Sequence, residues 1–132
     1  MVEGPLFNHV ALQCNDNKEA EIFFTEILGI PINKKFTISR ELSEAIFDID
    51  QSVDVEVYGN NETIFEIFIN PTEENRGYGH VCIEIDNKKE FIARCKRYEI
   101  KPKVISKDGK RLLFVRDFSG NLFEIKEKQR HQ

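Results

Sequence analysis

Residues 77–85 read Gly-Tyr-Gly-His-Val-Cys-Ile-Glu-Ile, and the architecture of the whole chain can be worked out from this stretch. Its residues alternate in character, with His80, Cys82 and Glu84 on one face and aliphatic side chains on the other. A period of two predicts a β-strand whose apolar face covers a core while its polar face stays open. A single histidine on such a face is ordinarily a solvated residue, so its meaning depends on whether the pattern recurs.

The pattern does recur, because residues 7–14 read Phe-Asn-His-Val-Ala-Leu-Gln-Cys. His9 and His80 lie 71 residues apart, and each is followed by valine. The tripeptide Phe-Glu-Ile of residues 65–67 also recurs, at 123–125, with a shorter offset of 58 residues. Internal repetition of this kind indicates two copies of one unit. The first copy then carries 13 additional residues between its helix and its last strand.

Each unit is predicted to form a strand, a helix and then three strands, in modules of about 1–75 and 76–132 within a single domain. Apolar residues at 20, 23, 24, 27 and 28 follow one helical stripe, after a cap in residues 15–17. Residues 40–48 carry both a helical spacing and a strand-like alternation; we expect a short helical turn there, which would account for most of the additional residues. The predicted strands are 6–14, 33–39, 52–58, 63–70, 78–85, 103–106, 111–116 and 122–126, and the second predicted helix covers about 88–98.

The composition restricts the class of protein. The chain has 132 residues, of which 40% are apolar and eleven are phenylalanine, enough to supply the core of one domain. No apolar run approaches the roughly 20 residues that span a bilayer, and the first residues do not resemble a signal peptide. The three cysteines contain no Cys-x-x-Cys motif. They are typical of reduced thiols, so we expect a cytoplasmic protein.

The charge is distributed unevenly along the chain. Residues 1–75 hold 15 acidic and 4 basic residues, a net charge of −11, whereas residues 76–132 hold 8 and 15, a net charge of +7. The two halves are either separately solvated surfaces or surfaces that attract each other within a chain or across a dimer. A pI near 5.5 and scattered basic residues argue against nucleic acid as a partner.

Four residues at equivalent positions of the two units are candidates for a metal site: His9, Glu66, His80 and Glu124. Each stands back to back with apolar neighbours. If those neighbours pack beneath the helices, all four point to the opposite surface of the sheet, and two units curving around that surface bring them together. Two imidazoles and two carboxylates suit a divalent ion such as Ni, Zn, Co, Mn or Fe(II). The alternative is four ordinary solvent-facing residues, but their recurrence favours a metal site.

These paired units with their four candidate ligands resemble the vicinal oxygen chelate superfamily. It includes glyoxalase I, methylmalonyl-CoA epimerase, fosfomycin-resistance enzymes, extradiol dioxygenases and bleomycin-binding proteins. The resemblance covers about residues 6–126. It implies an α+β fold in which paired βαβββ modules form a curved mixed sheet around a metal site, with helices on the outer face.

Within that superfamily the ligand order His, Glu, His, Glu is similar to bacterial glyoxalase I. Tyr78-Gly79-His80 matches its second-histidine motif, and residues 114–124 follow its pattern of strand, Asp-x-x-Gly turn and ligand strand. Asn70 matches an asparagine that contacts glutathione. Gln13 stands where glyoxalase I commonly has an arginine for the glutathione carboxylate. The resemblance implies substrate contacts at Gln13 and Asn70, and the missing charge leaves the identity of the thiol open.

The implied activity is that of a metal-dependent lyase or isomerase acting next to a carbonyl, in a hemithioacetal or a similar small substrate. Glu66 or Glu124 would take the C–H proton, with the metal acting as a Lewis acid, and the sequence leaves the choice of base open. The resemblance and the opposite charges of the two halves also predict a homodimer that binds a small molecule, without nucleic acid or membrane partners.

Two other classes of protein remain open from the sequence. One is a metal-free ligand-binding protein of the same fold, such as an antibiotic-sequestering protein, which has no reason to keep a complete set of ligands. The other is another enzyme of the superfamily, an epimerase or an Fe(II) dioxygenase. Epimerases tend to have glutamine at the first carboxylate, and dioxygenases use three ligands.

Overall fold

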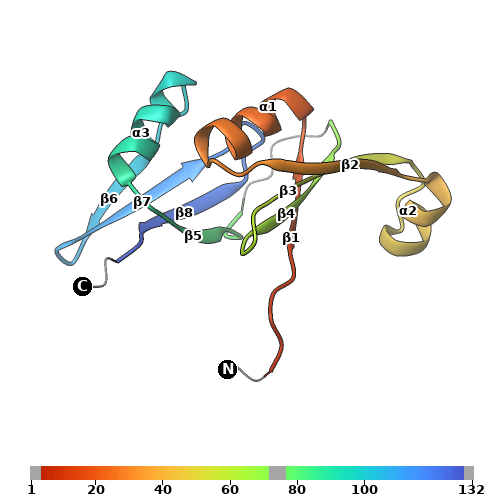
Figure 1. The fold of residues 1–132 in the computed structure, drawn as a ribbon, viewed down its shortest axis with the longest axis horizontal. Coiled ribbons are helices and arrows are strands. Elements are labelled where there is room, and N and C mark those ends of the chain that lie inside the picture. Colours follow the sequence, from red (N-terminus) through yellow and green to blue (C-terminus); the bar gives the residue numbers. More distant parts are fainter. Residues whose placement is uncertain (1–3, 72–76, 130–132) are drawn as a thin grey trace.

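The computed structural model describes residues 4–71 and 77–129, so the expected boundary between the modules, at residues 75 and 76, lies outside them. Two four-stranded sheets are formed, one from each half of the chain (Figure 1). The first contains β1 (Val10–Cys14), β2 (Ile32–Ile38), β3 (Val53–Gly59) and β4 (Ile64–Ile69). The second contains β5 (Val81–Ile85), β6 (Lys103–Lys107), β7 (Lys110–Arg116) and β8 (Leu122–Glu127).

The two sheets have the same topology. Their strand orders are β1-β4-β3-β2 and β5-β8-β7-β6, and in each the first strand pairs in parallel with the last while the other pairings are antiparallel. A parallel pair needs a long crossover connection, which the helix and the intervening strands of each module supply. The predicted α+β fold of paired βαβββ modules is confirmed, with the mixed sheet divided between the modules.

The helices of both modules begin at side-chain caps, the first of them within the predicted residues 15–17. Asp16 accepts a hydrogen bond from the Glu19 amide ahead of α1 (Asn17–Glu21), and Asn87 accepts one from Glu90 ahead of α3 (Lys88–Arg97). The first helix continues as a π-helical segment, η1 (Ile22–Ile27), a departure from the regular α-helix that the spacing predicts. Gly29 follows with φ of +76°, a conformation that glycine adopts without strain.

The core joins the two modules into one hydrophobic cluster. Phe24 of η1 packs against Phe65 of the first sheet and Phe123 of the second, with ring centroids 5.2 and 6.1 Å apart. Arg94 of α3 donates from Nε to the Ile27 carbonyl at 2.9 Å, so the two helices lie side by side (Figure 1). Each fully buried phenylalanine contributes about 1.5–3 kcal/mol, and this burial holds the modules together.

Most of the additional residues of the first module form the helix α2 (Arg40–Phe47), which confirms the expected helical turn over the strand that the alternation also allowed. Ser39 caps it through the Leu42 amide, and Asp48 ends it in the left-handed conformation. Figure 1 shows α2 at the end of β2, away from α1 and α3. Phe47 packs against Phe68 of β4, on the face of the sheet opposite to the core, so α2 does not join the helices of the outer face.

The first strand of each module is shorter than the sequence predicts. β1 and β5 begin at Val10 and Val81, one residue after each candidate histidine, because pairing with the last strand of the module begins there. Both histidines therefore lie where the chain enters its sheet. Among the described residues, no helix combines the length and the apolar character that crossing a membrane requires.

Candidate functional site

The first module brings His9 and Glu66 together on the open face of its sheet. The His9 Nε2 atom lies 3.4 Å from Glu66 Oε1, and both side chains remain partly exposed. Glu66 is placed by β4, whose alternation turns Phe65 and Ile67 into the core. The sequence separates these two residues by most of a module, so the parallel pairing of β1 with β4 creates the contact.

The second module repeats the same arrangement. The His80 Nε2 atom lies 3.6 Å from Glu124 Oε1, and the glutamate side chain is 19% exposed. Phe123 and Ile125 on either side of Glu124 are buried in the core. Cys82 is exposed beside Glu124 in the β5–β8 register, and partial burial together with that carboxylate raises the pKa of its thiol. The two modules thus present equivalent imidazole–carboxylate pairs.

Both histidines are oriented through their other ring nitrogen. The His80 Nδ1 atom lies 3.0 Å from the Tyr78 carbonyl oxygen, and the His9 Nδ1 atom lies 2.9 Å from Asn8 Oδ1. A carbonyl oxygen only accepts, so the Nδ1 atom of a neutral imidazole carries the proton and donates it. Nε2 then offers a lone pair toward the glutamate, the orientation that a metal-binding histidine requires.

The donor atoms of each pair fit a divalent cation. In the neutral tautomer an imidazole lone pair faces a carboxylate oxygen, an arrangement that a shared cation stabilises. Adjacent ligand atoms bound at about 2.1 Å are separated by roughly 3.0–3.4 Å, close to the distances in both pairs. The two pairs are not gathered into one site, because no cluster of three or more His, Cys, Asp or Glu in residues 4–71 and 77–129 could hold a metal ion.

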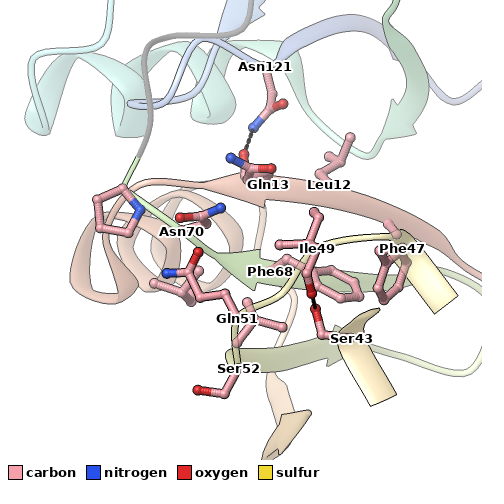
Figure 2. A pocket seen from close by; sticks show the side chains of 14 residues that line it. Leu12, Gln13, Ser43, Phe47, Ile49, Gln51, Ser52, Phe68, Asn70 and Asn121 are labelled. Atoms are coloured by element: carbon pink, nitrogen blue, oxygen red, sulfur yellow. Dashed lines mark hydrogen bonds between the residues drawn. The ribbon is translucent and has the colours of Figure 1, made fainter. Parts of the chain in front are cut away.

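A pocket of about 380 Å³ adjoins the first pair on the same face of the sheet. Ala11, which pairs with Glu66, and Phe68, two residues further along β4, both line it. The pocket therefore begins about 7 Å along the strands from the His9–Glu66 pair. Gln13 and Asn70, the two substrate contacts implied by the resemblance, lie together at its polar end (Figure 2).

Other parts of this pocket are absent from the sequence-based prediction. Phe47 and Ile49, from α2 and the loop after it, form an apolar wall opposite the sheet (Figure 2). The Ser43 hydroxyl donates to the Ile49 carbonyl at 2.9 Å and holds that loop against the helix. The signal for these residues in the sequence is the insertion itself, since a segment present in one module only can serve one half of a paired site.

A family model matches the chain over residues 6–125, and its description is the Glyoxalase/Bleomycin resistance protein/Dioxygenase superfamily. Among curated proteins, none matches the chain by sequence.

Solved structures with this fold come from several organisms. A glyoxalase family protein from Bacillus cereus has a TM-score of 0.72 at 18% identity, with 96% of this chain and 97% of that one covered. A variant of the fosfomycin resistance protein FosX from Listeria monocytogenes, complexed with Mn(II) and 1S,2S-dihydroxypropylphosphonic acid, has a TM-score of 0.72 at 17% identity, covering 98% and 95%. The trypanothione-dependent glyoxalase I of Leishmania major reaches 0.69 at 22% identity, covering 94% and 87%.

These likenesses show a shared fold rather than a shared substrate. The family match extends over both repeats, and it includes the strands that carry the two imidazole–carboxylate pairs. The chain therefore belongs to the Glyoxalase/Bleomycin resistance protein/Dioxygenase superfamily.

Proposed function

We propose that the protein is a metal-dependent lyase or isomerase of the glyoxalase I type, with His9, Glu66, His80 and Glu124 as metal ligands. The observation that carries the proposal is the equivalence of the two pairs, with Nε2–Oε1 distances of 3.4 and 3.6 Å and histidines oriented through Nδ1. A fosfomycin resistance protein of the same fold binds Mn(II) in its solved structure, which supports a divalent ion in this fold.

The active unit is a homodimer in which the His9–Glu66 pair of one chain meets the His80–Glu124 pair of the other. Within one chain the pairs form no common cluster among the described residues, and each stays open on its sheet. Large apolar side chains are exposed shortly before the first strand of each module: Phe7 is 97% exposed and Tyr78 99%. A second chain that covered these faces would also bring the acidic module against the basic one.

The chemistry assigned to the site is proton transfer between two carbons next to a carbonyl. A carboxylate, Glu66 or Glu124, takes the C–H proton and returns it to the neighbouring carbon, while the hydroxyl proton passes to the former carbonyl oxygen, so that the hemithioacetal of an α-ketoaldehyde becomes a 2-hydroxy thioester. A bound divalent ion supplies Lewis-acid polarisation of the substrate oxygens. Partial burial of both glutamates lowers the local dielectric, and the open face leaves room for the substrate.

A complementation experiment tests where the site lies. One variant carries His9→Ala with Glu66→Ala and the other His80→Ala with Glu124→Ala, and the two are coexpressed with different affinity tags. Each homodimer should bind no metal at stoichiometric levels. The heterodimer purified through both tags combines the two intact modules at one site, so it should hold about half of the wild-type metal content, measured by elemental analysis. Coexpressed wild-type chains with both tags provide the full-content control.

Three outcomes would contradict this proposal. Heterodimers without metal would place the four ligands within one chain, and failure to recover any double-tagged species would exclude the dimer. Wild-type protein without stoichiometric metal, after growth in Ni, Zn, Co, Mn and Fe(II), would instead favour the metal-free ligand-binding alternative. Activity is then tested by thioester formation from methylglyoxal hemithioacetals of several thiols, with epimerisation and dioxygenation assayed next.

A further inference from the structure

We propose that the pocket beneath α2 binds an uncharged, amide-bearing part of the substrate and disfavours an anionic one. This inference rests on the proposed function, because it concerns the portion of the substrate that extends away from the reacting carbons. Ala11, which pairs with Glu66, and Phe68, two residues further along β4, both line the pocket, so an extended substrate held at the His9–Glu66 pair would reach into it.

Among the residues that the structure describes, the lining of the pocket carries no charge. Fourteen described residues surround it, and none of them is acidic or basic. They are Ala11, Leu12, Gln13, Ser43, Phe47, Ile49, Gln51, Ser52, Val53, Phe68, Ile69, Asn70, Pro71 and Asn121. This is unusual in a chain with 32% charged residues. A carboxylate in such a pocket would lose hydration without gaining a cationic partner.

The polar groups of the pocket are mainly side-chain amides. Gln13, Gln51 and Asn70 lie around one end of the cavity, and each can both donate and accept (Figure 2). In the part of the chain that the structure describes, the side-chain amides of Gln51 and Asn70 make no hydrogen bond. Asn121 is already committed, since its Nδ2 donates to the Gln13 carbonyl and to Asp117 Oδ2, both at 2.9 Å. The group that best complements such side-chain amides is a second amide, because it also both donates and accepts hydrogen bonds.

The opposite end of the pocket is apolar. Phe47 and Phe68 meet edge to face with ring centroids 5.3 Å apart, and Ile49 lies beside them in the close-up of Figure 2. An occupant with an apolar group next to an amide would use both ends of the cavity. Burial of the apolar group supplies affinity, while the amides select the polar group.

The test uses two probes that differ by one carboxylate, S-methyl-N-acetylcysteamine and S-methyl-N-acetylcysteine. Neither can react, so binding is read without turnover, on the full-length protein as purified. Titrations followed by NMR of the side-chain amides report contact at Gln51 and Asn70 directly. We expect the neutral probe to shift these signals and to bind at least tenfold more tightly than the anionic probe. Gln13→Arg should reduce the preference for the neutral over the anionic probe by about tenfold, because it adds a cation at the polar end of the pocket.

Two matched variants show whether binding occurs in this pocket. Gln51→Trp fills the cavity from an exposed loop position and should abolish binding of the neutral probe. Gln129→Trp places the same side chain on an exposed position after β8 and should leave binding unchanged. Retained binding in Gln51→Trp, an equal or greater affinity for the anionic probe, or no binding of either probe at millimolar concentration would overturn the inference.

These outcomes separate the inference from the proposed function. A protein that isomerises hemithioacetals but prefers the anionic probe keeps its function and loses the neutral pocket. A protein that binds the neutral probe as expected but holds no metal in the complementation experiment keeps the pocket and loses the lyase assignment.

Discussion

His80→Ala should abolish stoichiometric metal binding while the protein remains folded. Replacing an outer partner of a metal ligand commonly costs 10- to 100-fold in affinity, and loss of the ligand itself should exceed about 100-fold. The His80 side chain is 40% exposed on the open face of the sheet, so its removal should change the free energy of unfolding by less than about 0.5 kcal/mol. Elemental analysis gives the metal content, and thermal unfolding of the metal-free forms gives the stability.

His131→Ala is the matched control for this variant. The third histidine of the chain lies in the C-terminal tail, outside the described residues, and belongs to neither repeat. The His131→Ala substitution should leave the metal content unchanged. If His80→Ala retained full metal content, His80 would have to be removed from the site, and the Nδ1 contact with the Tyr78 carbonyl would then have only a structural meaning.

Asp117→Ala should destabilise the protein by about 3–5 kcal/mol, because it leaves several buried donors unpaired. Asp117 is 7% exposed at the start of the turn between β7 and β8. Its Oδ1 accepts hydrogen bonds from the backbone amides of Ser119 and Asn121, both at 2.9 Å. Its Oδ2 accepts one from the side-chain Nδ2 of Asn121 at 2.9 Å and one from Cys14 Sγ at 3.5 Å. Burial raises the pKa of this carboxyl, while the bonds from Asn121 and Ser119 oppose that rise.

Urea unfolding measures this effect, with a matched aspartate and a conservative variant as controls. Asp54→Ala removes an exposed carboxylate that accepts a hydrogen bond from the Thr37 hydroxyl, and it should cost less than about 1 kcal/mol. Asp117→Asn keeps the oxygen that faces the two backbone amides and loses the other oxygen. Its loss of stability should therefore fall between those of Asp117→Ala and Asp54→Ala. A loss below 1 kcal/mol in Asp117→Ala would show that water replaces the carboxylate in the turn.

Much of the local structure follows from the sequence because its causes are local. Alternation predicts which face of β4 and β8 is apolar, and Phe65 and Phe123 are both buried as expected. The caps at Asp16 and Asn87 depend on residues three positions away, so a short stretch contains the information. The π-helical segment η1 could not be predicted from neighbouring residues, since it places Phe24 against both sheets and these contacts are distant in the sequence.

The candidate site was predicted as a set of residues, and the tertiary structure decided its grouping. The repeat offsets of 71 and 58 residues identify His9 and His80, and Glu66 and Glu124, as equivalent positions. The structure joins each histidine to the glutamate of its own module, because the first strand runs parallel to the last within one sheet. The meeting of all four residues at one site, which the sequence predicts, is therefore proposed to occur in the dimer.

By itself the sequence determined the repeat, the α+β modules and the residue types that face away from the core, since periodicity, capping and composition act over a few neighbouring positions. Only the tertiary structure decided that α2 covers the face beside His9 and Glu66, and that Gln13, Gln51 and Asn70 converge on one pocket whose described lining residues carry no charge. The physical reason is that the path of an inserted segment depends on which distant strand it packs against. In this chain that contact is Phe47 on Phe68, 21 positions away, which no local pattern contains.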